Sequence, residues 1–485
     1  MTKSVRHLAV DILDQVEKSK SFAGILLDEC LEVNALSGSA DGRLLTHLVY
    51  GVLRFRGHLD WILAKLLRGN WGKTDESIKN ILRTGLFQLK FSDRLPAFAV
   101  VNEAVKVAKN IAPAKSGLIN AVLRNYLRTG SSITFPPAEK NPAEFIAAFH
   151  SHPLWLVKEW IKLFGIANTL HLCAANNELP PLTLRVNTLK TSREDLQAKL
   201  TAAGFTSTKT RFSPDGLILN NVVFPLQKTG FFREGHLRLQ DEASQLISYL
   251  LNPQPPESIL DVCAGAGGKT THLAAILKNN GKILATDYDF KKINELKKEA
   301  TRLGINIIET TPADLTCGLP ESLREKFDSV LVDAPCSGLG TLRRNPEIKW
   351  HTTAADFTGF TRTQSAVIQN ASAAVRPGGR LVYCTCSLSP RENENVVGNF
   401  LQQNPDFSIC PPSSSIPSRF INSSGYFRTF PHLHNMDGFF AAILKTKVIP
   451  TGLHFNHQLR QRGGFSAPAG RSGSRQSNRP FSRGI

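Results

Sequence analysis

The sequence contains no long apolar run. Within its 485 residues, no stretch approaches the roughly 18–20 uninterrupted apolar residues of a membrane-spanning helix. The first residues, MTKSVRHLAVDILDQ, carry charges but lack the apolar centre of a secretory signal peptide. We therefore expect a cytoplasmic protein without a membrane partner.

Paired metal-binding and disulfide spacings are also missing. The eight cysteines are scattered through a large chain, unlike the dense pattern of a small disulfide-bonded domain. Neither a CxxC pair nor an HExxH motif occurs, so no spacing indicates zinc. These absences favour a reducing compartment and predict no metal site.

Acidic residues are few relative to basic ones. The chain holds 40 Asp and Glu against 58 Lys and Arg, which gives a net charge of +18. This excess favours a polyanionic partner, although a basic protein without such a partner would have the same composition. The apolar fraction of 41% suffices for real cores, and the length allows two to four domains.

The N-terminal part of the chain is helical in pattern. Apolar residues such as Leu8, Ile12 and Val16 recur at helical spacing, and no alternating strand pattern interrupts the series up to about residue 135. Residues 1–135 are therefore predicted to form an all-helical bundle. The stretch GSSITFPPAEKNPAE, residues 130–144, has three prolines and no periodicity, which predicts a linker.

Two α/β regions and a tail are predicted to follow. Residues 150–235 contain a strand, a turn and a helix, which indicates a small α/β subdomain. In residues 236–447, apolar strands alternate with helices, which predicts a Rossmann-like, doubly wound sheet. The predicted strands of this sheet are SILDVCA, KILATDYD, NIIETTPAD, FDSVLVDAP, RLVYCTCS and GFFAAILKT. Residues 451–485 hold six arginines, no acidic residue and much Gly and Ser, so we predict a disordered tail that tethers RNA or simply solubilises the chain.

The glycine-rich stretch CAGAGGKTTHLA, residues 263–274, lacks the glycines of the two phosphate-binding motifs. A P-loop requires a glycine where Cys263 stands, and the GxGxxG motif requires one at Thr270. The stretch nevertheless follows an apolar strand and precedes a helix. It therefore reads as the first strand-to-helix turn of a Rossmann-like sheet, where ligands gather at the carboxyl ends of the strands.

Acidic residues close the next two strands. Asp287 lies 22 positions after Gly265, about where a ribose-binding carboxylate belongs in such a fold. Asp314 closes the third strand and suits an exocyclic adenine amine. The pocket therefore favours adenosine without a phosphate, as in S-adenosylmethionine, although strand-end aspartates also serve as ordinary helix caps.

Two cysteines are placed for covalent chemistry. Cys336 and Cys386 each lie in a polar turn at a strand end. A thiolate that adds to C6 of a pyrimidine activates C5 for methylation, and a base must then remove the C5 proton. Asp333 is expected to stabilise the ring, and three basic residues are expected to favour ionisation of the thiol. These basic residues are Lys269, Arg343 and Arg344. Five of the other cysteines are predicted to be small core residues, namely Cys30, Cys173, Cys317, Cys384 and Cys410.

Five motifs resemble the RNA cytosine-5 methyltransferases in the correct order. They are DVCAGAGGKTTHLA, ATDYD, PADLT, VLVDAPCSGLGTLRRNPEIKW and GGRLVYCTCSLSPRENENVV. RLQDEASQL, residues 238–246, resembles the segment that precedes the first motif. NEAVKVAK and LINAVLRNYLR, in the helical region, resemble the NusB-type RNA-binding fold. The combination resembles bacterial 16S ribosomal RNA methyltransferases with a NusB-like domain.

The resemblance implies a fold, a reaction and residue roles. It implies a class I S-adenosylmethionine-dependent methyltransferase domain that methylates C5 of a cytosine in 16S rRNA, cytosine 967. Cys386 would be the nucleophile, Cys336 would serve proton removal and product release, and Asp333 would face the cytosine. The cofactor site would comprise Cys263, Ala264, Gly265, Ala266, Gly267, Gly268, Lys269, Asp287, Asp314 and Asp333. Gly265 and Ala266 depart from the family's Ala-Pro pair, which loosens the turn without removing a side-chain ligand.

The segment RRNPEIKW, residues 343–350, is expected to meet the RNA backbone. Its cations are Arg343, Arg344 and Lys349, and the alternative is a charged loop that closes the fold. The expected partner is 16S rRNA, free or in early small-subunit assembly, and the expected state is a monomer. Two rival hypotheses remain open, namely a cytosine-5 methyltransferase for another rRNA or tRNA and a non-catalytic RNA-binding scaffold.

Overall fold

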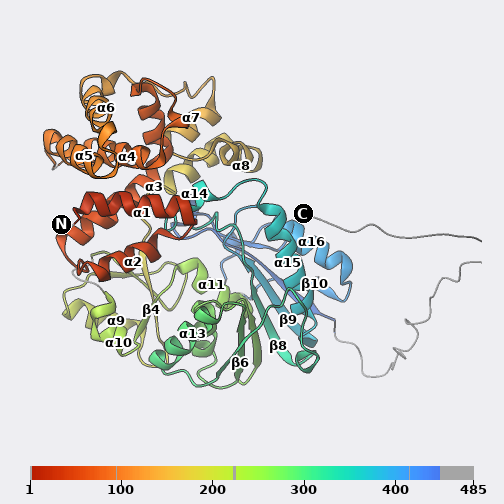
Figure 1. Ribbon diagram of the computed structural model, residues 1–485. Coiled ribbons are helices and arrows are strands. Elements are labelled where there is room, and N and C mark those ends of the chain that lie inside the picture. The colour runs from red at the N-terminus through yellow and green to blue at the C-terminus, as the bar shows by residue number, and fades with distance from the viewer. Residues whose placement is uncertain (1–2, 94, 222–225, 414–415, 448–485) are drawn as a thin grey trace, which may run out of the picture. The chain divides into compact units, whose positions relative to one another are not determined.

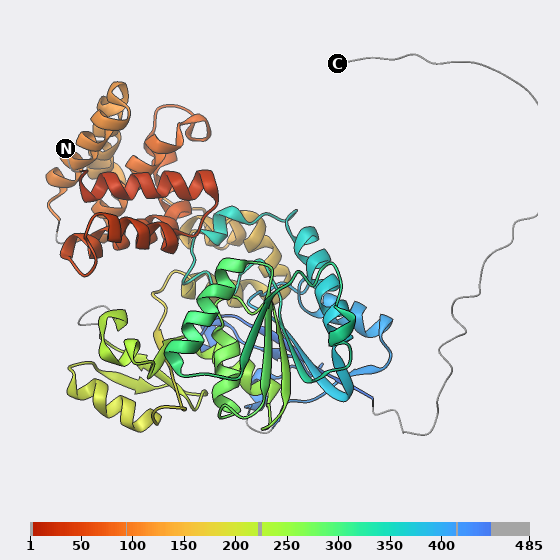
Figure 2. The ribbon, with the colours of Figure 1, turned by 60° about the horizontal axis from the view of Figure 1, so that its bottom comes forward.

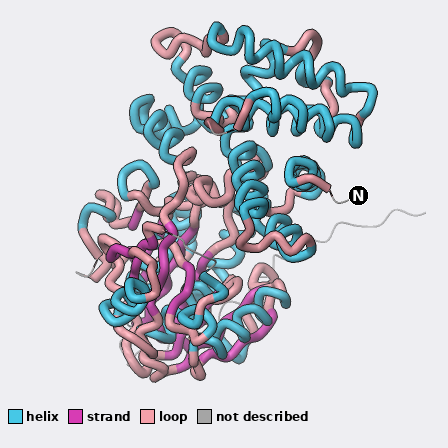
Figure 3. Tube along the Cα trace, turned by 90° about the vertical axis from the view of Figure 1, so that its left-hand side faces the viewer, coloured by secondary structure: helices cyan, strands magenta, loops and turns pink. Residues whose placement is uncertain are grey.

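The computed structural model describes residues 3–93, 95–221, 226–413 and 416–447 (Figure 1). The predicted tail at 451–485 lies outside the described residues. Within the described part, no helix is both long and apolar enough to cross a bilayer. Figure 3 shows one region built of helices alone and another in which the strands are gathered.

The N-terminal region is an all-helical bundle, as predicted (Figure 1). Ser4 caps the first helix by accepting a hydrogen bond from the His7 N–H, and the apolar face of that helix is buried in the bundle core. The stretch 23–33 also forms a helix, although its sequence has no helical repeat of its own. The helices are α1 (Val5–Ser19), α2 (Ala23–Val33), α3 (Ala40–Leu66), α4 (Glu76–Phe91), α5 (Ala97–Ile111) and α6 (Ser116–Thr129).

Two helices connect this bundle to the rest of the chain. Helix α7 (Pro142–Phe149) begins inside the predicted linker, with Pro142 in its first turn, where the missing proline N–H costs no helical hydrogen bond. Helix α8 (Leu154–Ala175) is interrupted at Gly165, whose φ of 78° is not helical. Trp160 of α8 is buried in a cluster with Leu342 from the loop near the predicted catalytic cysteines.

A small antiparallel sheet follows, in the order β2-β3-β1-β4. The helix α9 packs on this sheet. Ser192 caps α9 by accepting a hydrogen bond from the Asp195 N–H. The elements are β1 (Leu182–Val186), α9 (Arg193–Ala202), β2 (Ser207–Lys209), β3 (Gly216–Leu219), α10 (Gly230–Arg233) and β4 (Leu237–Leu239). The predicted strand, turn and helix in this region are thus confirmed.

The large sheet has eight strands in the order β10-β12-β9-β8-β5-β6-β7, with β11 paired to β12. The five strands from β9 to β7 are parallel and β12 is antiparallel to β9. The strands are β5 (Ser258–Val262), β6 (Lys282–Asp287), β7 (Ile308–Pro312), β8 (Phe327–Asp333), β9 (Val375–Thr385), β10 (Phe407–Ile409), β11 (Phe427–Arg428) and β12 (Phe440–Thr446).

Helices cover both faces of this sheet (Figure 2). Leu331 of β8 packs in one core cluster with residues of the helices on one face, whereas Val330 and Val332 pack in another with the helices on the opposite face. The first face carries α11 (Glu242–Leu251), α12 (Gly268–Ile276) and α13 (Phe290–Leu303), and the second carries α15 (Phe357–Ser372) and α16 (Glu394–Gln403). The predicted doubly wound sheet is confirmed.

The topology determines where a site can form. Because β6, β5, β8 and β9 are neighbouring parallel strands, their carboxyl ends lie at one edge of the sheet. The turn that begins at Cys263 follows β5, while Asp287 and Asp333 end β6 and β8. Cys386 follows β9 directly. The residues that the sequence singled out are therefore brought to a single edge.

Candidate active site

The turn after β5 depends on glycine at one position in particular. Gly267 has a φ of 79°, and a Cβ atom there would lie 2.7 Å from Cγ of Leu296. Gly267 therefore permits both the left-handed backbone and the close approach of α13. At Gly265, by contrast, a Cβ would meet nothing within 4 Å, since that residue lines a cavity.

Two arginines from the small subdomain support this turn from behind. Arg185 donates to the Gly268 carbonyl at 2.6 Å and to Thr271 Oγ1 at 2.9 Å. Arg238 donates to the Ala266 carbonyl at 2.8 Å. Neither residue is recognisable from the sequence, because both lie 28 or more positions from their partners in strands without a recognisable motif.

Asp287 reaches into the turn. Its Oδ2 accepts a hydrogen bond from the Gly265 N–H at 2.9 Å, and its Oδ1 accepts from the Asp289 N–H at 2.9 Å. The residue lines the same cavity as Gly265. Asp314 is placed differently, since it is exposed, accepts hydrogen bonds from Thr316 and is absent from the lining of that cavity.

A buried ion pair joins the turn to β8. Lys269 Nζ lies 2.6 Å from Asp333 Oδ2, and the Lys269 residue is 8% exposed. Burial disfavours the ammonium, but the Asp333 carboxylate, together with Cys384 and Cys386, outweighs burial and raises the pKa of Lys269. The Cys384 thiol donates to Asp333 Oδ1 at 3.4 Å, so one carboxylate is held by two neighbours.

The two predicted catalytic thiols meet at this edge. The sulfur atoms of Cys336 and Cys386 are 3.3 Å apart. The hydrogen bond between the thiols, together with burial, raises the pKa of Cys336 well above its usual value. Of the other cysteines, Cys173 and Cys384 are buried as predicted, whereas Cys317 is exposed.

Glu392 connects the turns that carry these two thiols. It is fully buried and accepts from the Ser337 N–H at 2.7 Å and from the Ser337 hydroxyl at 2.5 Å. The Ser387 hydroxyl also donates to it, as does Gln364 Nε2 at 3.1 Å. Since Ser337 and Ser387 each follow a cysteine, Glu392 fixes the relative position of Cys336 and Cys386. Glu392 lies in the motif GGRLVYCTCSLSPRENENVV, but the sequence predicts no role for it.

A cavity of about 720 Å³ opens over these groups. Its volume lies within the range of small-molecule sites. The predicted residues that line it are Cys263, Gly265, Asp287, Asp333, Cys336 and Cys386. An Asp287 carboxylate suited to ribose hydroxyls, beside a Gly265 whose Cβ side is open, fits an adenosyl group, and the two thiols stand in the same cavity.

Comparisons with known proteins agree with this arrangement. The family model described as 16S rRNA methyltransferase RsmB/F matches residues 248–445, that of the NusB family matches 3–128, and a ferredoxin-like domain of RsmF/B-like methyltransferases matches 152–224. A probable ribosomal RNA small subunit methyltransferase B from Synechocystis is 37% identical over 91% of this chain and 99% of its own length. A ribosomal RNA small subunit methyltransferase B from Escherichia coli is 32% identical over 92% and 99%. This chain belongs to the RsmB family.

Solved structures extend the likeness to three dimensions. The crystal structure of PH0851 is 27% identical and superimposes with a TM-score of 0.76 over 92% of this chain and 100% of that one. A methyltransferase homologue from Pyrococcus horikoshii is 28% identical, with a TM-score of 0.54 over 62% of this chain and 97% of its own. The RsmB-family chain thus combines a NusB domain with the fold of an S-adenosylmethionine-dependent methyltransferase.

The cations of the RRNPEIKW segment are placed differently from the prediction that they contact RNA. Arg343 and Lys349 are 2% and 1% exposed. Lys349 donates to the carbonyls of Arg54 and Ser151, at 2.8 and 3.0 Å, and to Asn177 Oδ1 at 3.1 Å. The segment therefore joins the catalytic domain of this RsmB-family chain to its helical bundle and to the residues that flank α8, which agrees with the alternative of a loop that closes the fold.

Arg343 and Arg344 are occupied in a similar way. Arg343 Nη2 donates to Asn435 Oδ1 at 3.0 Å, and Arg344 pairs with Asp241 at 2.7 Å and Asp437 at 2.8 Å. These contacts favour a loop that closes the fold over an RNA contact of Arg343, Arg344 or Lys349. The expectation that Arg343 and Arg344 favour ionisation of a catalytic thiol loses its support, since both are engaged elsewhere. Lys269 differs from both arginines, since an electrostatic interaction with Cys386 contributes to its raised pKa.

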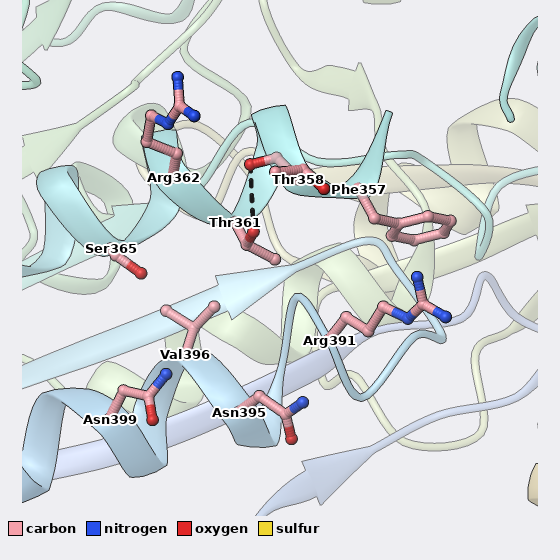
Figure 4. Close-up of a pocket in the computed structure, with 9 residues that line it drawn as sticks. All are labelled: Phe357, Thr358, Thr361, Arg362, Ser365, Arg391, Asn395, Val396 and Asn399. Atoms are coloured by element: carbon pink, nitrogen blue, oxygen red, sulfur yellow. Dashed lines mark hydrogen bonds between the residues drawn. The ribbon is translucent and has the colours of Figure 1, made fainter. Parts of the chain in front are cut away.

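A second cavity, of about 450 Å³, lies between α15 and α16 (Figure 4). The Arg391 guanidinium lies over the Phe357 ring, 5.5 Å from its centre, while Figure 4 shows Arg362 turned away from Asn395 and Asn399. The polar groups therefore do not converge on one point. No group of three or more His, Cys, Asp or Glu suited to a metal ion occurs among the described residues.

Proposed function

We propose that this protein methylates C5 of a cytosine in 16S rRNA, cytosine 967, through a transient bond between Cys386 and C6 of the base. The observation that carries the proposal is the pair of sulfur atoms 3.3 Å apart in a cavity that Asp287 also lines. S-adenosylmethionine, when bound along the Gly265 turn and Asp287, supplies the methyl group. The non-catalytic scaffold is disfavoured, because none of these groups is missing.

The two thiols are proposed to have separate roles. Cys386 adds to C6, since a thiolate is a strong nucleophile towards the ring and Lys269 provides the neighbouring positive charge. Cys336 assists removal of the C5 proton and the release of Cys386, since its sulfur lies within reach of the same ring. The raised pKa of Cys336 keeps this group a thiol at rest, so Cys386 rather than Cys336 is proposed as the attacking thiolate.

Asp333 is proposed to face the cytosine. It lines the cavity and its position is fixed by Lys269 at 2.6 Å and by the Cys384 thiol at 3.4 Å. A carboxyl group there can hydrogen-bond to N3 and the exocyclic amine of the ring, where charge changes during the reaction. The remaining cofactor residues of the prediction, Ala264, Ala266, Gly267 and Gly268, form the backbone of the turn. Asp314 is proposed to contact only the outer part of the cofactor, because it does not line the cavity.

The substrate is proposed to be 16S rRNA before or early in small-subunit assembly, bound by a monomer in the cytoplasm. Support comes from the curated relatives, which are named for the small-subunit RNA, and from the net charge of +18. Bisulfite mapping of ribosomal RNA from a deletion strain tests the target. Loss of one 5-methylcytosine from 16S rRNA supports the proposal, whereas an unchanged 16S pattern moves the substrate to another RNA.

Variants of the two thiols test the mechanism. Cys386→Ala should abolish methyl transfer without any covalent complex. Cys336→Ala should allow attack but impair release, so that protein accumulates covalently attached to RNA on denaturing gels. Cys317→Ala is the matched control, because that thiol is exposed and outside the cavity. Equal loss of activity in both active-site variants, with no trapped RNA, would contradict the separate roles.

A further inference from the structure

The cavity over the two thiols is not formed by the catalytic domain alone. Its lining includes Lys20 and Phe22, from the turn between α1 and α2 of the NusB-like bundle. These residues lie more than 200 positions before the catalytic motifs in the sequence. The helical domain therefore contributes side chains to the cavity in which methyl transfer is proposed.

The turn is fixed against the opposite wall by a buried contact. The Ala23 N–H donates to Glu347 Oε1 at 2.9 Å, and Glu347 is 1% exposed. Burial raises the pKa of Glu347. Its neighbour Ile348 and the nearby His351 line the cavity. One hydrogen bond thus sets the distance between the helical turn and the catalytic wall.

A second set of contacts holds the two domains together beside that bond. Trp350 Nε1 donates to the Leu53 carbonyl at 2.7 Å, and Arg54 Nη2 donates to the Arg343 carbonyl at 2.9 Å. With these partners, α3 and the 343–350 segment form one continuous junction. Lys20 and Phe22 are therefore held at the cavity rather than hanging from a free turn.

The chemistry of the two side chains suits single-stranded RNA. The Phe22 residue is 49% exposed, although it lies at the junction of two domains. Lys20 ends α1 and forms no ion pair with any residue that the structure describes. An exposed aromatic ring beside an unpaired cation is the combination that stacks on a splayed base and contacts its phosphate.

We propose that Phe22 and Lys20 form a subsite for a nucleotide that neighbours the target cytosine in the RNA strand. Phe22 stacks on the base and Lys20 contacts the phosphate. This inference rests on the proposed function, since it assumes that the cavity receives an RNA base. It assigns to the NusB-like bundle a direct part in positioning the substrate for the methyl-transfer site.

The test compares paired variants in steady-state methylation of a 16S rRNA fragment. Phe22→Ala should lower kcat/KM for RNA by about 5- to 100-fold, mainly through KM, because stacking of one base is lost. KM for S-adenosylmethionine should not change, and Phe22→Trp should restore activity. Phe98→Ala is the control, since Phe98 is 74% exposed on α5 and does not line the cavity. Thermal unfolding of each variant excludes a general loss of fold.

The charge is tested by salt dependence. Lys20→Gln should reduce the slope of log affinity against log salt concentration by about 1, the value for one phosphate contact. Lys18→Gln is the control, since Lys18 is also exposed on the same helix but is absent from the cavity. An unchanged slope for Lys20→Gln would overturn the phosphate contact.

The outcomes separate this inference from the proposed function. If the wild-type protein methylates the 16S fragment while Phe22→Ala matches Phe98→Ala, the subsite is refuted and the proposed function stands. A rise in KM for S-adenosylmethionine alone would also refute it, because Phe22 would then serve the cofactor. If the wild-type protein methylates no ribosomal RNA, the proposed function fails and the inference fails with it.

Discussion

Lys349 provides a direct test of the junction between the domains. Its ammonium is buried and donates to three oxygen atoms, those of Arg54, Ser151 and Asn177, with no carboxylate among them. Burial lowers the pKa of Lys349 well below its usual value. We consider the substitution Lys349→Met, which keeps the length of the side chain and removes its charge and donors.

The expected loss follows from the contacts. Hydrogen bonds from a charged donor contribute about 1.5–3 kcal/mol each, so three favour the folded junction by about 5–9 kcal/mol. Burial of the ammonium costs several kcal/mol of hydration, which methionine avoids. The net expected destabilisation by Lys349→Met is about 2–3 kcal/mol.

Guanidinium unfolding, followed by tryptophan fluorescence, to which the neighbouring Trp350 contributes, measures this loss. Lys298→Met is the control, since Lys298 lies exposed on α13 and should change stability by less than about 0.5 kcal/mol. If Lys349→Met is as stable as the wild type but binds 16S RNA more weakly with a reduced salt slope, then the junction argument is refuted and an RNA contact is favoured instead.

Two further predictions concern the sheet edge. Asp261 is buried, which raises its pKa from 3.8 to about 7, so the folded state holds this proton more tightly than the unfolded chain. The stabilisation that this proton provides is therefore lost as the pH rises from about 4 to 7. The stability of Asp261→Asn should accordingly gain about 4 kcal/mol relative to the wild type across that window. Urea titrations at several pH values measure both stabilities, and a difference between the two proteins that does not change with pH would contradict the prediction. A Cβ at Gly340 would lie 1.9 Å from the Gly438 carbonyl oxygen, and the Gly340 N–H donates to the Cys386 carbonyl. Gly340→Ala should therefore reduce methylation at least tenfold. Gly398→Ala in α16 is the control and should leave activity unchanged, because a Cβ there meets nothing within 4 Å.

Much of the fold could be predicted because its signals are local. Apolar runs of five to seven residues such as β5, β6 and β8 are readable from the chain itself, and so are the helical repeats of α1 and α13. Helix α2 lies within the predicted helical region but has no individual signal, because its buried face consists only of Ala23 and Leu27, which leaves little periodicity. The start of helix α7 was assigned to a linker because Pro142 and the two prolines before it, Pro136 and Pro137, indicate a break in regular structure.

The candidate site could be predicted only in part, for the same reason. Cys336, Cys386 and Asp287 stand at strand ends, and a parallel sheet brings such ends together. Arg185 and Glu392 act through partners that are distant or that belong to another turn, so no spacing identifies them. The charges of Arg343 and Lys349 suggested RNA, but charge does not reveal burial, and packing against the helical bundle decided their role.

The strand that completes the catalytic edge is the last one in the described chain. β12 pairs along β9, with Phe440 opposite Thr385, and the Gly438 N–H donates to the Gly340 carbonyl at 2.8 Å. Until β12 emerges and pairs with β9, that strand has one unpaired side and the turn behind Cys386 lacks its backing. During synthesis, then, the helical bundle leaves the ribosome first, whereas Cys386 is correctly held only after β12 has been made and has paired with β9.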